Sequence, residues 1–600
     1  MSKSFLSVIF LLLLMTFGVG CNDDKLAYEP KENFIIEILG GEVHIEDYFG
    51  NNMEVAVPPM IDGRKVTSIR LRNKGVTKLI IPDSVMTIED SAFMGTYLKS
   101  VNIPNSVTKI GREAFKGCTE LTSVTFPKSV TKIGSKAFEG CTGLTSITIP
   151  DSITVIGSEA FSYCIGLTSL TIQDSVIQIG WSAFSGCTGL TSITIPNSVT
   201  EIGKEAFSGC TGLTNVNIPD SVTKIGESAF KGCTGLTSII IPNSVKTIGK
   251  EAFYGCMRLT SATIPNSANN ILERDLKNCA VTISHGVTKI DNEAFRFCKW
   301  LTSITIPESV TEIGEFAFDN CTGLTSVTIP NSVKKIDYGA FSCCTGLTNI
   351  TIPESVTEIG SKAFLDCRGM TSVTIPNSVT KIGSEAFRDC GELTSVAIPN
   401  SVTEIGIEAF RDCGGLTSLT IQDGVKEIGN SAFNNCTGLT SVTIPSSVKE
   451  IGEGAFKNCT GLTSLTIQDG VTEISPYAFI GCTGLTSVTI PNSVKKIGHY
   501  AFNNTGLTSV TIPSSVKEIG EGAFKNCTGL TSLTIQDGVT EIGLSAFFGC
   551  EGLTSVTIPK SVTKIGYDAF NLTGLTSVSI PQKISLADDT FPRDCNISRY

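Results

Sequence analysis

Residues 144 to 166 read Leu-Thr-Ser-Ile-Thr-Ile-Pro-Asp-Ser-Ile-Thr-Val-Ile-Gly-Ser-Glu-Ala-Phe-Ser-Tyr-Cys-Ile-Gly, and this unit decides the fold. It recurs with small changes from about residue 80 to residue 580, and its Phe returns every 23 residues through Phe115, Phe138 and Phe161. A fixed period of this length is typical of a solenoid, in which each unit buries its apolar side only against its neighbours. We therefore expect about 22 stacked coils rather than several globular domains.

Each unit has the pattern of a short β-rich coil. The segment from Leu144 to Ile149 alternates apolar and polar residues and is rich in β-branched side chains, which predicts a strand that ends at Pro150. A second extended piece ends at the Ile-Gly bend, and we expect Ala-Phe to form a single 3₁₀ or helical turn. Leu, Val, Ile, Val, Ile, Ala, Phe and Cys then make about eight inward positions per coil.

Departures from the period divide the chain into segments. Asp275-Leu276 stands where Ala-Phe belongs, and a short segment ending at His285 replaces the full strand, so we expect an irregular coil or kink there. The expected divisions are an N-terminal cap at 34–80, a repeat array at 81–265, the irregular coil at 266–291, a second array at 292–581 and a C-terminal cap at 582–600.

The first residues have the pattern of an export signal. The apolar run from Phe5 to Phe17 is too short to span a bilayer and fits residues 1–20 as a secretory signal peptide. Small residues lead to Cys21, and this resembles a bacterial lipobox, in which the first mature Cys receives a lipid. Residues 22–33 then form a polar tether. The prediction is a cell-surface, outer-membrane lipoprotein held in the membrane only by its N-terminal lipid, with an ordinary signal peptide as the alternative.

The charge balance disfavours one class of partner. The formal net charge of the 600-residue chain is −11, and charged residues make up only 17% of it. A phosphate backbone would be repelled by such a surface, so nucleic acid is not an expected partner.

The repeat closely resembles the BspA-like leucine-rich repeat. The likeness rests on the Leu-Thr-Ser-Val-Thr-Ile-Pro-Asn-Ser-Val-Thr-Lys-Ile-Gly-Ser-Glu-Ala-Phe-x-x-Cys unit, and on a lead-in at residues 62–69 that resembles the opening of such arrays. The resemblance implies a right-handed, curved leucine-rich-repeat solenoid. It also implies a cell-surface or secreted protein of a host-associated bacterium, or of a protist, that adheres to host proteins or to other microbes. The family supplies no catalytic motif.

Cysteine is the most conspicuous candidate for chemistry, with 22 residues, nearly one per coil. Consecutive Cys side chains in a parallel stack point the same way, whereas a disulfide needs facing Cβ atoms. A metal site is disfavoured because there is no CxxC pair and His44, His285 and His499 are scattered. We therefore expect a column of buried free thiols, with no metal and no cofactor. The near absence of His from the array also leaves no Ser/His/Asp set, so an enzyme is not expected.

Two surfaces are candidates for binding. Coils differ most just after Ile-Gly and just after Ala-Phe, and large rings gather there, which favours anchors for protein partners. The alternative is that each ring covers a gap in the neighbouring coil. The strand face instead presents columns of Thr, which suit strand propensity and also suggest a remote alternative, an ice-binding ladder. The candidate ridge residues are Trp181, Trp300, Phe316, Tyr338, Tyr477, Tyr500 and Tyr567.

The repetition itself bears on function. Residues 437–474 are identical to residues 505–542, which indicates recent lengthening by copying. Such growth is easily accommodated if length and avidity matter. We interpret the chain as a surface adhesin that binds host extracellular-matrix proteins, host cell-surface proteins or the surface proteins of other microbes through many similar contacts. The alternative is a passive spacer or surface-coat protein.

Overall fold

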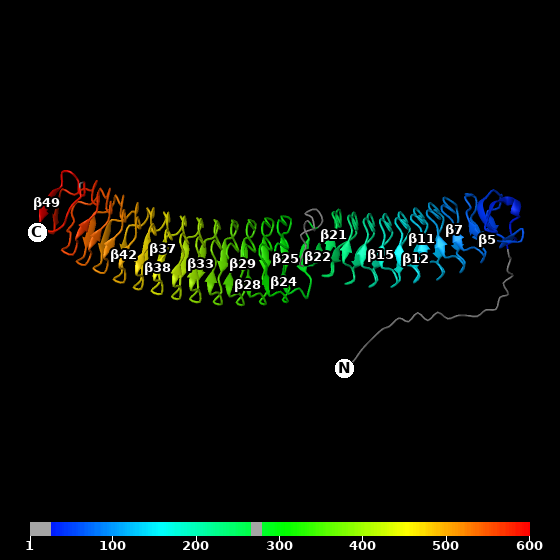
Figure 1. The fold of residues 1–600 in the computed structure, drawn as a ribbon, viewed down its shortest axis with the longest axis horizontal. Coiled ribbons are helices and arrows are strands. Elements are labelled where there is room, and N and C mark those ends of the chain that lie inside the picture. Colours follow the sequence, from blue (N-terminus) through cyan, green and yellow to red (C-terminus); the bar gives the residue numbers. More distant parts are fainter. Residues whose placement is uncertain (1–25, 266–275, 277–278, 588) are drawn as a thin grey trace, which may run out of the picture.

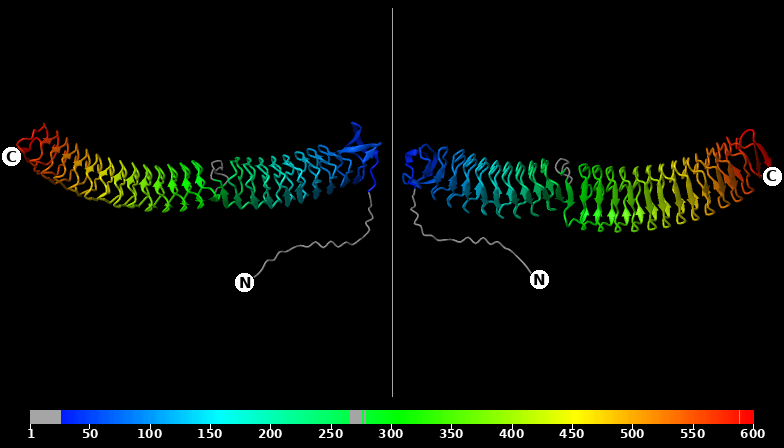
Figure 2. Two further views of the ribbon diagram at one scale, coloured as in Figure 1. Left: turned by 60° about the horizontal axis from the view of Figure 1, so that its bottom comes forward. Right: turned by 180° about the vertical axis from the view of Figure 1, so that it is seen from behind.

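The computed structural model is a gently bowed rod in which coils follow one another in chain order from one end to the other (Figure 1). It describes residues 26–265, 276, 279–587 and 589–600. The rod is a parallel β-solenoid of about 24 turns of about 23 residues. The bow persists when the molecule is turned about its long axis or seen from behind (Figure 2). The expected signal peptide and Cys21 lie outside the described residues.

In most coils the first strand follows a Leu-Thr pair, and these strands stack in one parallel column that is divided among four sheets. This first-strand column consists of β3 (Glu54–Ala56), β6 (Lys78–Ile80), β8 (Ser100–Asn102), β10 (Ser123–Thr125), β12 (Ser146–Ile149), β14 (Ser169–Ile172), β16 (Ser192–Thr194), β18 (Asn215–Asn217), β20 (Ser238–Ile240), β22 (Ser261–Ile264), β23 (Ala280–Ile283), β25 (Ser303–Thr305), β27 (Ser326–Thr328), β29 (Asn349–Thr351), β31 (Ser372–Thr374), β33 (Ser395–Ile398), β35 (Ser418–Ile421), β37 (Ser441–Ile444), β39 (Ser464–Ile467), β41 (Val488–Thr489), β43 (Ser509–Ile512), β45 (Ser532–Ile535), β48 (Ser577–Ile580) and β49 (Asn596–Arg599).

From β7 onward the second strand is two residues long and ends at the Ile that precedes the bend. The second-strand column consists of β2 (Glu42–Tyr48), β5 (Arg64–Ile69), β7 (Thr87–Ile88), β9 (Lys109–Ile110), β11 (Lys132–Ile133), β13 (Val155–Ile156), β15 (Gln178–Ile179), β17 (Glu201–Ile202), β19 (Lys224–Ile225), β21 (Thr247–Ile248), β24 (Lys289–Ile290), β26 (Glu312–Ile313), β28 (Lys335–Ile336), β30 (Glu358–Ile359), β32 (Lys381–Ile382), β34 (Glu404–Ile405), β36 (Glu427–Ile428), β38 (Glu450–Ile451), β40 (Glu473–Ile474), β42 (Lys496–Ile497), β44 (Glu518–Ile519), β46 (Glu541–Ile542) and β47 (Lys564–Ile565).

The N-terminal end is closed by a different structure. Here η1 (Lys31–Asn33), the one 3₁₀ helix among the described residues, leads into β1 (Phe34–Leu39), which pairs antiparallel with β2. The short β4 (Met60–Ile61) pairs antiparallel with β5. Antiparallel pairing turns the chain back on itself, so these strands cover the first coil of the stack.

The Ala-Phe segment forms no helix in any described coil, which corrects the expected helical turn. The two residues that flank it are left-handed, as at Phe316 (φ 54°) and Asn320 (φ 60°), and a left-handed residue every four positions prevents a helix from continuing. Instead, alternate backbone N–H groups reach forward to the next coil. Phe316 donates to Tyr338 O at 2.9 Å, and Phe318 to Ala340 O at 2.7 Å. A third hydrogen-bonded ladder, with every donor facing the C-terminal end, therefore runs along the rod.

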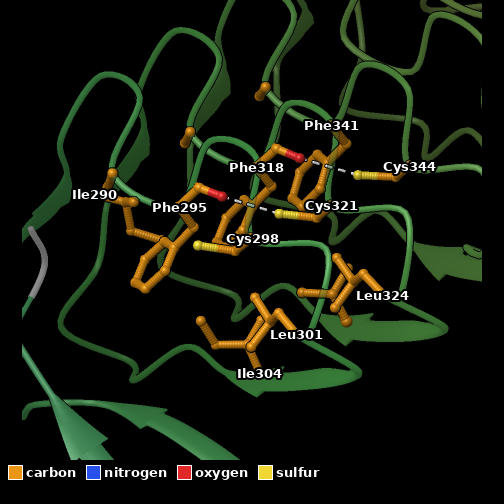
Figure 3. Close-up of a cluster of buried hydrophobic side chains, with 14 of the residues drawn as sticks. Ile290, Phe295, Cys298, Leu301, Ile304, Phe318, Cys321, Leu324, Phe341 and Cys344 are labelled. Atoms are coloured by element: carbon orange, nitrogen blue, oxygen red, sulfur yellow. Dashed lines mark hydrogen bonds between the residues drawn. The ribbon is translucent and has the colours of Figure 1, made fainter. Parts of the chain in front are cut away.

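The eight expected inward positions of a coil are all buried. The Phe rings stack nearly parallel, with centroids 5.1 Å apart for Phe295 and Phe318 and 5.0 Å apart for Phe318 and Phe341. Beside them lies the Cys column (Figure 3). For one coil the inward residues are Leu324, Val327, Ile329, Val333, Ile336, Ala340, Phe341 and Cys344.

Two coils that lack Cys show how the register survives. The 22-residue steps after Phe93 and Phe502 suggest that the Cys position itself has been deleted. In the structure, Thr96 and Thr505 occupy that position, buried, and each hydroxyl donates to the Phe carbonyl of its own coil at 2.9 Å. The position stays filled because Thr is close to Cys in size, and the missing residue belongs to the adjoining loop.

The array changes at the expected irregular coil. Ser261 pairs with Ala280, 19 residues on, whereas Ser303 pairs with Ser326, 23 residues on, so the step is four residues short. The first-strand column continues through β22 and β23, but no second strand is described between β21 and β24. Leu276 is buried, and its carbonyl accepts the Cys279 N–H at 3.0 Å, as Phe carbonyls do elsewhere. Residues 266–275 and 277–278 of the expected kink lie outside the described residues.

Candidate binding surfaces

The turn ridge is the column of segments between the Ile-Gly bend and the Cys of each coil, for example residues 315–320. Its left-handed residues direct side chains outward, and here the coils differ in sequence. Of the expected anchors, Trp181 is 47% exposed, Tyr567 46% and Tyr477 36%. Phe316, Tyr338 and Tyr500 are half-buried. Six of the seven candidates thus lie on the surface of this ridge.

Trp300 does not lie on the ridge, because it is 7% exposed and belongs to the core. It occupies a position that is usually Gly. A Cβ added at the equivalent Gly323 would lie 2.2 Å from the Lys299 carbonyl oxygen of the preceding coil, so a side chain is normally excluded there. Before Trp300 the preceding coil is shortened, since Cys279 is followed directly by the first residue of β23. The indole therefore fills space that the missing residues would occupy.

One group of ring and basic side chains is continuous across several coils of the ridge. The guanidinium of Arg296 lies 4.8 Å from the ring centroid of Phe297 and 5.0 Å from that of Phe316. Phe316 meets Tyr338 edge to face at 5.2 Å, and the Lys362 amine lies 5.8 Å from the Tyr338 ring. We call these five residues the Arg296 cluster. Cation–π contacts of this kind hold exposed rings in fixed positions.

Three members of this cluster, Arg296, Phe297 and Lys362, are not among the candidate ridge residues of the sequence analysis. Arg296 directly follows a core Phe, and its Nε also bonds the Asp319 carboxylate at 3.0 Å. The sequence signal for these contacts is a basic residue that lies beside a Phe or Tyr of the next coil. This signal can be recognised only when the alignment of one coil with the next is known.

A second ring pair lies further along the ridge. Tyr477 and Tyr500 stack with centroids 5.6 Å apart and planes 3° from parallel. The Tyr500 hydroxyl donates to Glu521 at 2.6 Å, and this hydrogen bond to a carboxylate raises the pKa of Tyr500 to about 12. The phenol therefore stays protonated and fixed at physiological pH.

Several rings also cover backbone of the next coil. A Cβ added at Gly186, Gly339 or Gly522 would lie 2.6, 2.7 or 2.4 Å from the ring of Tyr163, Phe316 or Tyr500 respectively. These three rings therefore shield the following coil as well as presenting an outer face. Trp181 is not among these three, so its indole remains the simpler candidate for an anchor.

The strand face is tied to the protein's own backbone. In many coils the Thr that precedes the first strand donates its hydroxyl to a carbonyl of the coil before it, as Thr325 does to Thr302 O at 3.1 Å and Thr371 to Thr348 O at 3.3 Å. A hydroxyl used in this way has no proton to donate to an ice lattice. This column of Thr gives the ice-binding alternative no support.

The cysteines are buried thiols that bond to backbone. Within the described residues all are free, and in Figure 3 the Cys321 Sγ donates to Phe295 O at 3.0 Å and the Cys344 Sγ to Phe318 O at 3.1 Å. Burial raises the pKa of the Cys164, Cys298 and Cys390 thiols to about 12. Such thiols are poor nucleophiles at physiological pH. Only Cys343 and Cys595 are half-buried in the described part of the chain.

The described residues contain neither a metal-binding group nor a membrane-spanning helix. No group of three or more His, Cys, Asp or Glu residues is placed to hold a metal ion. No helix there is long and apolar enough to cross a membrane.

A model of a known repeat family matches most of the chain. The model of the BspA type leucine rich repeat region (6 copies) matches residues 67–191, 154–282, 276–393, 358–486 and 472–598. No curated protein sequence matches the chain.

Several solved structures are similar. A leucine rich cell surface protein from Faecalibacterium prausnitzii is 29% identical, with 66% of this chain and 95% of that one covered and a TM-score of 0.28. A T. pallidum leucine rich repeat protein is 27% identical over 39% of this chain and 91% of that one, with a TM-score of 0.28. A leucine-rich repeat protein from Bacteroides ovatus is 22% identical over 96% of this chain and 100% of that one, with a TM-score of 0.28. With the family model matching most of its length, the chain belongs to the BspA-type leucine-rich repeat family.

Proposed function

We propose that the chain is a surface-displayed binding protein whose turn ridge takes up protein ligands by multivalent contact. The observation that carries the proposal is the Arg296 cluster, in which rings and cations form one continuous outward strip. Tyr, Trp and Arg are the side chains most often found at the energetic centres of protein interfaces. Similar weaker contacts along the rod would add avidity, because a first contact raises the effective concentration of the next.

The finer assignment is an adhesin for host extracellular-matrix proteins, host cell-surface proteins or the surface proteins of other microbes. It is supported by membership of the family and by similarity to a protein described as a cell surface protein. Anchoring through a lipid on Cys21 is part of the same proposal. The rival is a passive spacer, which the uniformity of the coils and the copied block at residues 437–474 and 505–542 favour.

The adhesin and the spacer are distinguished by equilibrium binding. The chain from Asn22 onward is tested for binding to immobilised matrix and cell-surface proteins. The second arm is a deletion of residues 368–436, three whole coils of 23 residues that leave the register intact and the Arg296 cluster in place. A multivalent binder gives saturable binding that weakens in a graded way with the deletion. A spacer gives no saturable binding at either length, and that result would overturn the proposal. Mass measurement of the mature N-terminus tests the lipid on Cys21.

A further inference from the structure

A hollow lies beside the irregular coil, on a different surface from the turn ridge. Its volume is about 900 Å³. It is lined by side chains from the ends of β18, β20 and β22 and from the turn after β23, among them Asn217, Asp220, Ile240, Asn243, Thr263 and His285. This volume lies in the range of small-molecule sites.

The hollow coincides with local changes in the repeat. The usual Pro-Asn-Ser turn is replaced after β23 by Ser284, His285 and Gly286. Asn243, two coils earlier, donates its side-chain amide to the His285 carbonyl at 3.5 Å, which spans the coil between them. Ser284 is buried and donates to Ile264 O at 3.1 Å, so the turn that carries His285 is hydrogen-bonded to both of the coils that precede it.

The floor of the hollow is also locally distinct. The outward position near the end of the first strand is Thr in most coils, for example Thr305, but it is Asn217 in β18 and Ile240 in β20. Both residues line the hollow, and Ile240 is 63% exposed. An exposed Ile between polar neighbours supplies an apolar patch that a Thr would not.

The chemistry of the lining restricts the ligand. The described residues that line the hollow include no Lys or Arg, so these residues offer phosphate, sulfate and carboxylate groups no counter-charge. Side-chain amides, hydroxyls, one imidazole and one carboxylate instead offer both donors and acceptors. The underlying strands pair with each other, Asn217 with Ile240 and Ile240 with Thr263, so the floor has no open edge to which a peptide strand could add.

We infer that this hollow is a binding site for a neutral oligosaccharide. Vicinal hydroxyls both donate and accept, which matches Asn217, Asp220 and Asn243, and the C–H face of a sugar ring would lie on Ile240. Asn197, Asp220 and Asn243 hold the same repeat position in three successive coils, so polar groups recur at about 4.8 Å, the spacing of neighbouring strands. A chain of sugar units running along the rod could meet them in turn.

The test is binding of the chain from Asn22 onward to neutral hexasaccharides of glucose, mannose, xylose and galactose, by calorimetry. The main variant is Asn217→Thr/Ile240→Thr, which restores the residues of regular coils and so cannot disturb the repeat. His285→Ala is a second variant. Asn331→Ala/Asn377→Ala, at the position of Asn243 in regular coils, is the matched control.

We expect saturable binding of at least one of these sugars, weakened at least tenfold by each hollow variant and unchanged by the control. Three outcomes would overturn the inference. They are no binding to any of the hexasaccharides, binding that the hollow variants leave intact, and binding that the control weakens as much as the hollow variants do. Because the turn ridge is untouched in every variant, protein binding is measured separately and can fail or succeed independently.

Discussion

A regular coil and the irregular coil differ in how many layers connect them to their neighbours. The coil from Ser303 to Phe318 is joined to the next by two strand ladders, by the Ala-Phe ladder and by the stacked Phe and Cys columns. At the irregular coil the first-strand column passes through β22 and β23, while the described residues contain no second strand between β21 and β24. The comparison teaches that one continuous ladder keeps the stack in register, and that the layers around it tolerate local change.

The largest expected effect comes from the thiol column of the regular coils. Burial raises the pKa of thiols such as Cys164, Cys298 and Cys390 to about 12, whereas an unfolded thiol has a pKa of about 8.5. The folded state therefore binds more protons above pH 8.5. The contribution of each such thiol to the free energy of unfolding is constant below that pH and falls by about 1.4 kcal/mol per pH unit up to pH 12.

Urea unfolding between pH 7 and pH 11 measures this effect. The regular arrays are expected to lose stability steeply above pH 8.5. Equal stability at pH 8 and pH 10.5 would show that the thiols titrate normally and are accessible.

Next in size is removal of a core ring. Phe410→Ala in a regular coil takes away a stacked, fully buried ring, and should lower local stability by about 3–5 kcal/mol. Leu276→Ala, at the same position of the irregular coil, removes a smaller side chain and should cost about 2–3 kcal/mol. Hydrogen exchange, read coil by coil, measures both. An equal or larger loss for Leu276→Ala would reverse the comparison.

Trp300 and Gly323 hold equivalent positions beside the irregular coil and in a regular coil, so substitutions at both sharpen the comparison. Trp300→Ala should open a cavity and cost about 3 kcal/mol at that coil. Gly323→Ala should be destabilising by about 1–3 kcal/mol because its Cβ would lie 2.2 Å from the Lys299 carbonyl oxygen. Thermal unfolding of the two variants gives the result. A neutral Trp300→Ala would mean that the indole does not fill the space left by the short step.

The smallest expected effect is at a single thiol. Cys413→Ser keeps a donor toward Phe387 O, which the Cys413 Sγ reaches at 3.1 Å, and should cost about 1 kcal/mol or less. Cys413→Ala loses the donor and leaves a small void, for about 1–2 kcal/mol. Cys343→Ser, at a half-buried position, serves as the control. A larger cost for Ser than for Ala would contradict the donor role.

Much of the fold could be predicted because the same residue pattern recurs in one coil after another. The eight inward positions and the two strands follow from apolar spacing. The left-handed turns beside Ala-Phe could not be predicted, since residues such as Glu113, Phe316 and Tyr500 occupy conformations that favour Gly. Trp300 is buried, and Thr505 fills the Cys position, because neighbouring loops are shorter than in a regular coil. The pattern of residues around each position does not show how such a deletion changes the packing.

The candidate surfaces could be predicted only in part. Exposed rings on the ridge follow from where coils vary, but the contact of Arg296 with Phe297 and Phe316 needs the coil-to-coil spacing. The hollow beside Ile240 needs three coils and the turn after β23 to be placed together.

The central claim is that coils bind ligands where they differ and not where they repeat. The most direct measurement compares two double variants for binding to the same immobilised protein ligand. Phe297→Ala/Tyr338→Ala removes rings from the turn ridge, and Thr305→Ala/Thr328→Ala alters exposed Thr on the strand face of the same stretch. The account predicts at least tenfold weaker binding for the ridge variant and little change for the strand-face variant. Loss of binding by the strand-face variant alone would contradict it.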